Sequence, residues 1–169
     1  MNAILPSSPF YALRVRLLRL CGVRVEGNVR INTRVSLYWH NLSLGENTWV
    51  GPECTFSSTP EAGIKIGANC DIAPQVTFVT GTHELGSERR RAGKGKSLPI
   101  VVGDGCWIGA RAVILGGATI GKGCVIGAGS VVVSGEYPAN TLIAGVPARV
   151  KKPLAVDQPR EPLAQVETA

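Results

Sequence analysis

The chain has 169 residues, of which 44% are hydrophobic but only 5% aromatic, and its formal net charge is +6. This length fits a single domain with a continuous core of Val, Ile, Leu and Ala. The basic residues form no long run, and neither base-stacking aromatics nor a nucleic-acid motif is present, so the charge favours a small anionic ligand over nucleic acid.

The N-terminal segment, residues 1–22, contains a short amphipathic helix predicted over Pro9–Leu20. One helical face carries the apolar residues Phe10, Leu13, Leu17 and Leu20. Arginines lie on its other sides, at positions 14, 16 and 19, and Val15 and Leu18 widen the apolar stripe. We expect this helix to pack against the side or end of the remaining fold. Contact of a basic amphipathic helix with an anionic membrane surface is the alternative.

Residues 23–152 form a hexapeptide-repeat domain. Its clearest stretch has a branched aliphatic residue every six positions: Val102, Ile108, Ile114, Ile120, Ile126 and Val132. Helices and strands have face periods of 3.6 and 2, whereas a six-residue period is typical of a parallel β-helix. Three hexads make one coil. Glycine often follows the aliphatic residue, where it is expected to serve the bend, and a small residue fills the fifth position.

The repeat is interrupted between Glu84 and Pro99 by ELGSERRRAGKGKSLP, which has no aliphatic rhythm. A long loop inside a compact repeat array is usually functional or disordered. Its cations, Arg89, Arg90, Arg91, Lys94 and Lys96, could bind phosphates or an anionic substrate, or simply face solvent. Residues 153–169 are predicted to form a flexible polar tail.

Four of the five cysteines occupy the fifth hexad position: Cys54, Cys70, Cys106 and Cys124. We therefore expect small, buried hydrophobic side chains. There is no CxxC pair and no secretory signal peptide, which indicates a reduced, cytoplasmic setting. No metal site is predicted.

The chain resembles the hexapeptide-repeat acyltransferases over residues 23–152. The matching sequences are GTHEL at 81–85, Leu98-Pro99-Ile100, GDGCWIGARAVIL at 103–115 and NTLIAGVPARV at 140–150. Within that family it looks most like the maltose, galactoside and capsular-sugar O-acetyltransferases. The resemblance implies an all-β fold: a left-handed parallel β-helix with a short N-terminal helix, an excursion loop (84–99) and a short C-terminal segment. It also implies a homotrimer with active sites between subunits, the loop reaching across.

The same resemblance assigns the chemistry to His83, which would act as the general base. Imidazole suits that role because its ordinary pKa lies near working pH. His83 would take a proton from a hydroxyl of a sugar or glycan precursor, which attacks the thioester of acetyl-CoA. Glu84 could orient His83, but we interpret it as a loop carboxylate because adjacent residues of an extended chain point to opposite sides.

The remaining site residues also follow from the resemblance. Glu53 stands where the related sugar acetyltransferases often carry an acceptor-binding Asn; it is a departure, because an ionised carboxylate donates no hydrogen bond. Trp107 would line the cleft. The backbones of Ala110 and Ala128 would bind the pantetheine arm, and Arg149 and Lys152 the nucleotide phosphates. The family's Thr-Lys after GAGSxV is missing, since residues 133–135 are Val-Ser-Gly.

Three other functions are compatible with parts of this sequence. An N-acetyltransferase acting on an amino sugar is barely separable by sequence, and a non-catalytic β-helix scaffold would share the fold. A zinc enzyme of the γ-carbonic-anhydrase kind needs three histidine ligands, but this chain has two histidines. The resemblance therefore implies a CoA-dependent O-acetyltransferase.

Overall fold

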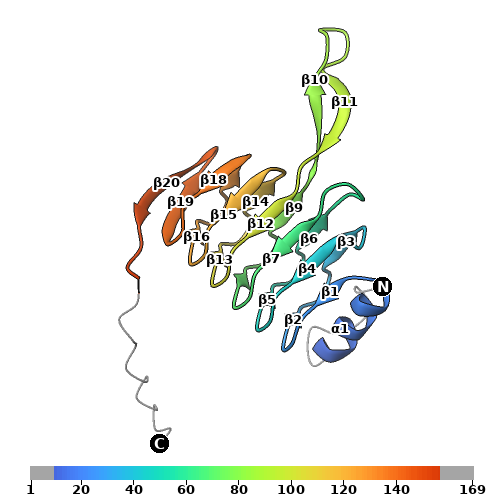
Figure 1. Cartoon of the computed structure of the whole chain (residues 1–169), viewed down its shortest axis with the longest axis vertical. Coiled ribbons are helices and arrows are strands. Elements are labelled where there is room, and N and C mark those ends of the chain that lie inside the picture. The colour runs from blue at the N-terminus through green and yellow to red at the C-terminus, as the bar shows by residue number, and fades with distance from the viewer. Residues whose placement is uncertain (1–9, 157–169) are drawn as a thin grey trace, which may run out of the picture.

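The computed structural model describes residues 10–156, in which α1 (Tyr11–Leu20) precedes a three-faced stack of coils (Figure 1). Face A contains β1 (Arg24–Val25), β4 (Leu42–Leu44), β7 (Ile64–Ile66), β12 (Ile100–Val102), β15 (Ala118–Ile120) and β18 (Gly135–Tyr137). Face B contains β2 (Arg30–Ile31), β5 (Trp49–Val50), β8 (Asp71–Ile72), β13 (Trp107–Ile108), β16 (Val125–Ile126), β19 (Thr141–Gly145) and β20 (Ala148–Pro153). Face C contains β3 (Ser36–Tyr38), β6 (Thr55–Ser57), β9 (Thr77–Val79), β14 (Val113–Leu115) and β17 (Val131–Val132).

The chain passes from face A to face B to face C and then returns to face A one coil further on, which defines an A–B, a B–C and a C–A corner. Strands of neighbouring coils pair in parallel, and within the three faces β20 alone folds back antiparallel, on β19 at the end of face B. The architecture is the left-handed parallel β-helix that the sequence predicts.

The six-residue period fixes the register of this stack. Val102 pairs with Ile120, and Ile108 pairs with Ile126, so residues three hexads apart lie side by side. The six aliphatic repeat residues from Val102 to Val132 are at most 1% exposed, and the fifth-position residues beside them are buried as well. Burial of this apolar column on all three faces is the main source of stability.

The repeat glycines have a different role from the one expected. Gly109 does not have a positive φ; instead, a Cβ there would lie 2.5 Å from the backbone nitrogen of Ala128 in the next coil. Left-handed conformations occur two residues later, as at Arg111, with φ +60°. These repeat glycines therefore allow close approach between coils, whereas the bend itself is made at the following positions.

α1 packs against β1 and β2, as expected, and it does so through Val15 and Leu18 at the margin of its apolar stripe. The helix starts at Tyr11, whereas Pro9 lies outside the described residues. Arg14 and Val15 are buried against the coils, and Nη1 of Arg14 donates to the carbonyl of Ile31 at 3.3 Å. Leu13 and Leu20 are 40% and 84% exposed. The part of the predicted stripe that contains Leu13 and Leu20 is thus turned outward.

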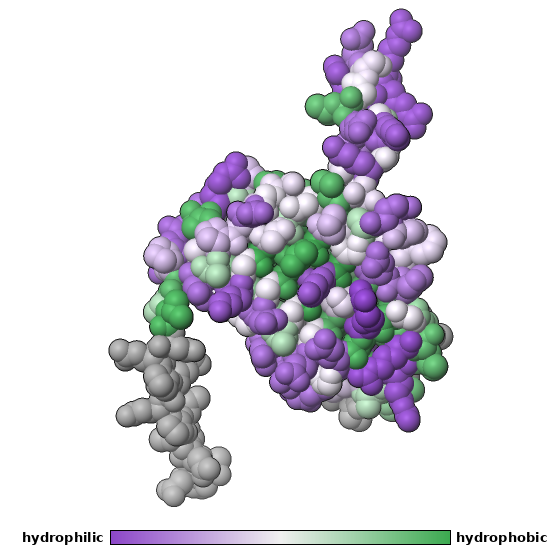
Figure 2. Space-filling model, in the orientation of Figure 1, coloured by the Kyte–Doolittle hydropathy of each residue, from purple (hydrophilic) through white to green (hydrophobic). Residues whose placement is uncertain are grey.

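The predicted excursion loop is a β-hairpin, which we call the arm (81–97). It consists of β10 (Gly81–Leu85) and β11 (Ala92–Ser97), paired antiparallel, and it leaves the stack at the C–A corner between β9 and β12. Figure 1 shows it standing clear of the coils, and Figure 2 shows a largely hydrophilic surface. The arm thus begins at Gly81, three residues before the predicted loop.

The burial of four cysteines predicts which thiols react in the native protein. Cys54, Cys70, Cys106 and Cys124 are at most 1% exposed, whereas Cys21 is exposed. Burial raises the pKa of the Cys54 thiol to about 11. We expect a thiol-reactive dye to label only Cys21 in the native protein and all five cysteines in denaturant, because labelling needs an accessible thiolate. Labelling of a second cysteine without denaturant, detected by peptide mass, would contradict this arrangement.

Candidate functional site

The arm holds His83 in a defined position. His83 lies in β10 directly across from Gly95 in β11, and its side chain is exposed. The structure places it on the arm, beyond the C–A corner. The two strands of the arm, β10 and β11, bury no hydrophobic core of their own. The position of His83 therefore depends on the pairing of their backbones.

A hydrogen bond selects the tautomer of His83. Its Nδ1 lies 3.1 Å from the carbonyl oxygen of Gly93. Because a carbonyl oxygen can only accept, Nδ1 carries the proton in this arrangement and the neutral ring keeps a lone pair on Nε2. The ring thus has one nitrogen fixed by the backbone and the other available to take a proton.

Gly93 must be a glycine for this arrangement to form. A Cβ at this position would lie 2.9 Å from the carbonyl oxygen of Glu84 and 3.1 Å from the nitrogen of Gly86. Gly93→Ala should therefore move the carbonyl that binds His83, and, with His83 in the general-base role that the resemblance implies, we expect a roughly tenfold lower turnover rate. The measurement is steady-state acetyl transfer.

Gly27→Ala is the matched control, because a Cβ there meets nothing within 4 Å and Gly27 is far from the arm in the sequence. We expect the control to keep wild-type turnover. Equal turnover of both variants would show that the Gly93 carbonyl does not matter.

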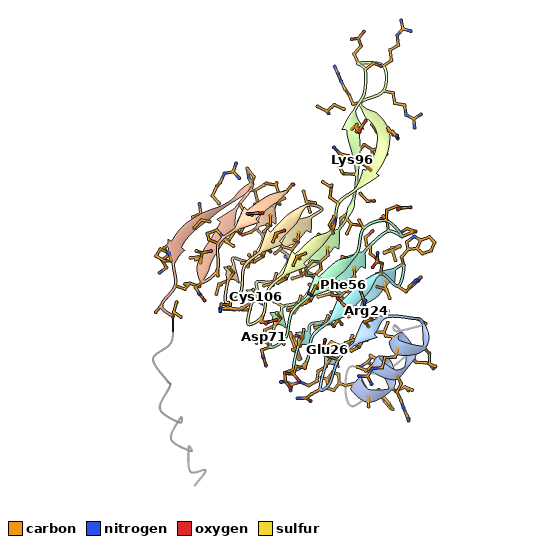
Figure 3. All side chains as sticks on the ribbon, viewed as in Figure 1. Arg24, Glu26, Phe56, Asp71, Lys96 and Cys106 are labelled. Carbon is orange, nitrogen blue, oxygen red and sulfur yellow. The ribbon has the colours of Figure 1, made fainter. Side chains whose placement is uncertain are left out.

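His83 lines a groove at the base of the arm. The other lining residues are Thr59, Glu61, Gly81, Thr82, Gly95, Lys96 and Ser97. Oγ1 of Thr59 donates to Oγ of Ser97 at 2.9 Å and accepts from the nitrogen of Ala62 at 3.1 Å, which ties the arm to the 58–62 turn. Figure 3 labels Lys96 on this arm.

Thr59, Glu61 and Ser97 carry no sequence signal that marks them as site residues. Thr59 and Glu61 fall in residues 57–65, where the hexad rhythm slips. Both interruptions, however, fall between face C and face A, on successive coils. The number of hexads between the two interruptions therefore predicts that they lie side by side at one corner of the stack.

Glu53 lies at the B–C corner, away from the arm. One carboxylate oxygen is 3.3 Å from Nη1 of Arg34, and the other accepts from Nε2 of Gln75 at 2.8 Å. The amide oxygen of Gln75 in turn accepts from Nε of Arg111 at 2.7 Å. These four exposed side chains form a polar ladder across the coils.

The ladder fixes the charge of Glu53. Hydrogen bonds from Gln75 and Arg34 hold the pKa of its carboxyl below the ordinary value. Glu53 is therefore ionised at neutral pH, and its contribution is lost only as the pH falls through that lowered pKa.

Three further predicted residues lie near the same corner or on face B. Trp107 begins β13 and is 57% exposed. Ala110 and Ala128 follow β13 and β16 at the B–C corner of successive coils. The carbonyl of Ala110 accepts from the nitrogen of Gly129 at 2.8 Å, which links those coils.

Arg149 and Lys152 lie on β20, the edge strand of face B. Both side chains are exposed, and Nη1 of Arg149 donates to the carbonyl of Ala148 at 2.8 Å. An edge strand with exposed cations is suited to bind phosphate groups.

The structure thus separates the predicted residues into two groups. One group is His83 with its groove at the C–A corner; the other comprises Glu53, Trp107, Ala110, Ala128, Arg149 and Lys152, on face B and the B–C corner. A single chain does not bring the two groups together. Across residues 10–156 there is also no cluster of three His, Cys, Asp or Glu side chains able to hold a metal ion.

Comparison with family models supports the repeat. Residues 99–134 match the model described as bacterial transferase hexapeptide (six repeats), and residues 41–73 match the hexapeptide repeat of succinyl-transferase. The chain is also 36% identical over 141 residues to WcaF of Escherichia coli strain K12, a protein named for acetyl transfer in colanic acid biosynthesis. That match covers 83% of this chain and 74% of WcaF.

Two solved structures are similar over most of the chain. A maltose O-acetyltransferase from Clostridium difficile 630 matches with a TM-score of 0.78 and 32% identity, over 92% of this chain and 81% of that one. The hexapeptide-repeat acetyltransferase VCA0836 from Vibrio cholerae O1 biovar eltor, complexed with acetyl coenzyme A, matches with a TM-score of 0.76 and 31% identity. The latter match covers 86% of this chain and 78% of that one.

Proposed function

The chain belongs to the hexapeptide-repeat acetyltransferases, and from that premise we propose that it moves an acetyl group from acetyl-CoA to a hydroxyl of a sugar or glycan precursor, with His83 as general base. The observation that carries the proposal is the exposed His83 ring, whose Nδ1 is held by Gly93 while Nε2 is free to accept a proton. The sugar acceptor is supported by the name of one similar structure, a maltose O-acetyltransferase.

In this mechanism His83 moves a single proton. Nε2 removes it from the acceptor hydroxyl while the hydroxyl oxygen bonds to the acetyl carbonyl carbon. The Nδ1–H bond to Gly93 stabilises the positive charge on the ring. His83 then returns the proton to the sulfur as the carbon–sulfur bond breaks, so the products are the acetyl ester and the CoA thiol.

The residues of face B and the B–C corner fit acetyl-CoA, which supplies the activated acetyl thioester when bound. Arg149 and Lys152 would hold its phosphates. Trp107, with more than half its surface exposed, offers an apolar wall for the pantetheine arm. The small side chains of Ala110 and Ala128 leave the backbone of the corner accessible to it.

We place the complete site between two copies of the chain in a homotrimer. The arm of one copy would bring His83 to the B–C corner of the next, where the CoA-binding residues lie. The arm itself supports this arrangement. The side chains of β10 are all exposed, and an isolated two-stranded hairpin is only marginally stable in water. Contact with a neighbouring copy would order it.

Glu53 would contact the acceptor from the B–C corner. Its ionised carboxylate can accept a hydrogen bond from a sugar hydroxyl while it keeps its bonds to Arg34 and Gln75. In the proposed trimer Glu53 and the CoA-binding residues would come from one copy and the base from the other.

The function is tested by release of free thiol from acetyl-CoA with a panel of sugars, amino sugars and nucleotide sugars. We expect acceptor-dependent release and an alkali-labile acetyl ester in the product. Release only with amino sugars, giving an alkali-stable amide, would favour the N-acetyltransferase. Absence of both release and CoA binding would favour the non-catalytic scaffold.

A further inference from the structure

The apolar face of α1 is available for a contact outside the fold. At about 100° per residue, Phe10, Leu13, Leu17 and Leu20 fall within an arc of about 80°. Phe10 and Leu13 are 38% and 40% exposed, and Leu20 is 84% exposed. A helix that served only to cover the coils would turn this arc inward. Here the inward side carries Arg14 and Val15 instead.

Exposed aromatic side chains extend the apolar face onto the coils. Tyr38 and Trp39, at the end of β3, are 59% and 58% exposed. A groove runs between α1 and this region, lined by Arg14, Leu17, Leu18, Cys21, Val35, Leu37, Trp39 and His40. We call Phe10, Leu13, Leu17, Leu20, Tyr38 and Trp39 together the α1 surface.

The backbone at Trp39 is unusual. Its φ is +66°, a left-handed conformation that is rare for a bulky residue and costs free energy. Trp39 keeps this conformation while its side chain is 58% exposed. Trp and Tyr are the side chains enriched where an apolar phase meets water.

The positive charge of the protein is concentrated at the same end. Residues 10–40 contain six arginines and one glutamate, which accounts for five of the six net charges of the chain. Arg16 is exposed and lies three and four residues from Leu13 and Leu20 on α1. Arg24 is exposed on β1, beside α1 in Figure 3. Figure 2 shows apolar and hydrophilic areas side by side over α1.

We propose that the α1 surface docks on an anionic lipid bilayer, with α1 lying in the interface. Leu13, Leu20 and Trp39 would enter the headgroup region, and Arg16 and Arg24 would meet the lipid phosphates. A second copy facing the same surface would oppose arginine to arginine, which disfavours a symmetric contact. Within residues 10–156 no helix is long and apolar enough to cross a bilayer, so this contact is peripheral.

The test is flotation of the full chain with vesicles of phosphatidylcholine alone or mixed with phosphatidylglycerol. We expect binding to the mixed vesicles that weakens with added salt. Leu13→Ser combined with Leu20→Ser should lower partition more than about tenfold, because both side chains lose apolar burial. Arg16→Gln should lower it about fivefold. Val156→Ser, which alters an equally accessible apolar residue (73% exposed), should leave partition unchanged.

Three results would overturn the proposal. The first is wild-type protein that does not float, or a Leu13/Leu20 double variant that floats as well as wild type. The second is a smaller oligomer in the double variant, measured by light scattering, which would make the α1 surface a contact between copies. The third is flotation that appears only after residues 1–9 are deleted, which would show that this segment covers the surface. Circular dichroism of each variant checks that the coils remain folded.

Discussion

Replacing His83 by alanine is expected to lower kcat for acetyl transfer by about a hundredfold to ten-thousandfold. The reason is the loss of the imidazole ring, whose Nδ1 is held by the Gly93 carbonyl and whose Nε2 would accept the proton. KM for acetyl-CoA should change little, because the proposed CoA-binding residues lie on face B. Thiol release at saturating donor and acceptor measures this effect.

The neighbouring carboxylate is the control for His83. Glu84 is exposed on the same strand, and Glu84→Gln keeps its size while removing its charge. We expect this variant to retain turnover close to wild type. Equal turnover of wild type and His83→Ala would exclude His83 as the base, and a comparable loss in Glu84→Gln would make the carboxylate part of the catalytic machinery.

Reversing the charge of two residues on β20 is expected to have the next largest effect. Arg149→Glu combined with Lys152→Glu should raise KM for acetyl-CoA about tenfold to a hundredfold, because in the proposed site each substitution would remove a charge-assisted hydrogen bond to phosphate. kcat at saturating donor should remain near wild type. Direct titration with CoA provides a second readout.

Lys65→Glu is the matched charge reversal for this experiment. Lys65 is exposed on β7 in face A, away from β20. Its substitution makes the same change in net charge as one of the two β20 substitutions, so it separates local binding from long-range attraction. An equal rise in KM for Lys65→Glu and for the β20 variant would remove Arg149 and Lys152 from the binding site.

The fold could be predicted from sequence because the six-residue repeat specifies which side chains are buried in each coil. Each of the six aliphatic repeat residues from Val102 to Val132, spaced six apart, is buried, and the 18-residue spacing of a coil reappears as the pairing of Val102 with Ile120. The register of β strands is specified wherever a face is buried. The same reasoning found the buried cysteines, because a small fifth residue is required beside each aliphatic one.

The arm could not be predicted in the same way. Residues 81–97 bury no apolar face, so their pairing leaves no periodic hydrophobic signal in the sequence. The informative residues were glycines: Gly93 allows the close approach of the two strands. The GTHEL motif singled out His83 as a candidate, but it did not predict that His83 lies on a hairpin or that its ring binds the carbonyl of Gly93.

The orientation of α1 shows a further limit of periodicity. The pattern correctly grouped Phe10, Leu13, Leu17 and Leu20 on one face, but it did not determine which face meets the coils. Packing of Val15 and a hydrogen bond from Arg14 to Ile31 decided the orientation. The resemblance assigned His83 and Glu53 to one site between subunits; within one chain they lie at different corners, and the proposed contact between copies would join them.

The most direct test of a site shared between copies is activity in mixed oligomers. His83→Ala subunits lack the base, and Arg149→Glu/Lys152→Glu subunits lack the phosphate contacts. Co-expressed at equal levels and assayed at low acetyl-CoA, they should regain about a quarter of wild-type activity, because random assembly in a ring joins an intact arm to an intact face B at that frequency. Activity no greater than the average of the two parent proteins would contradict a site built from two copies.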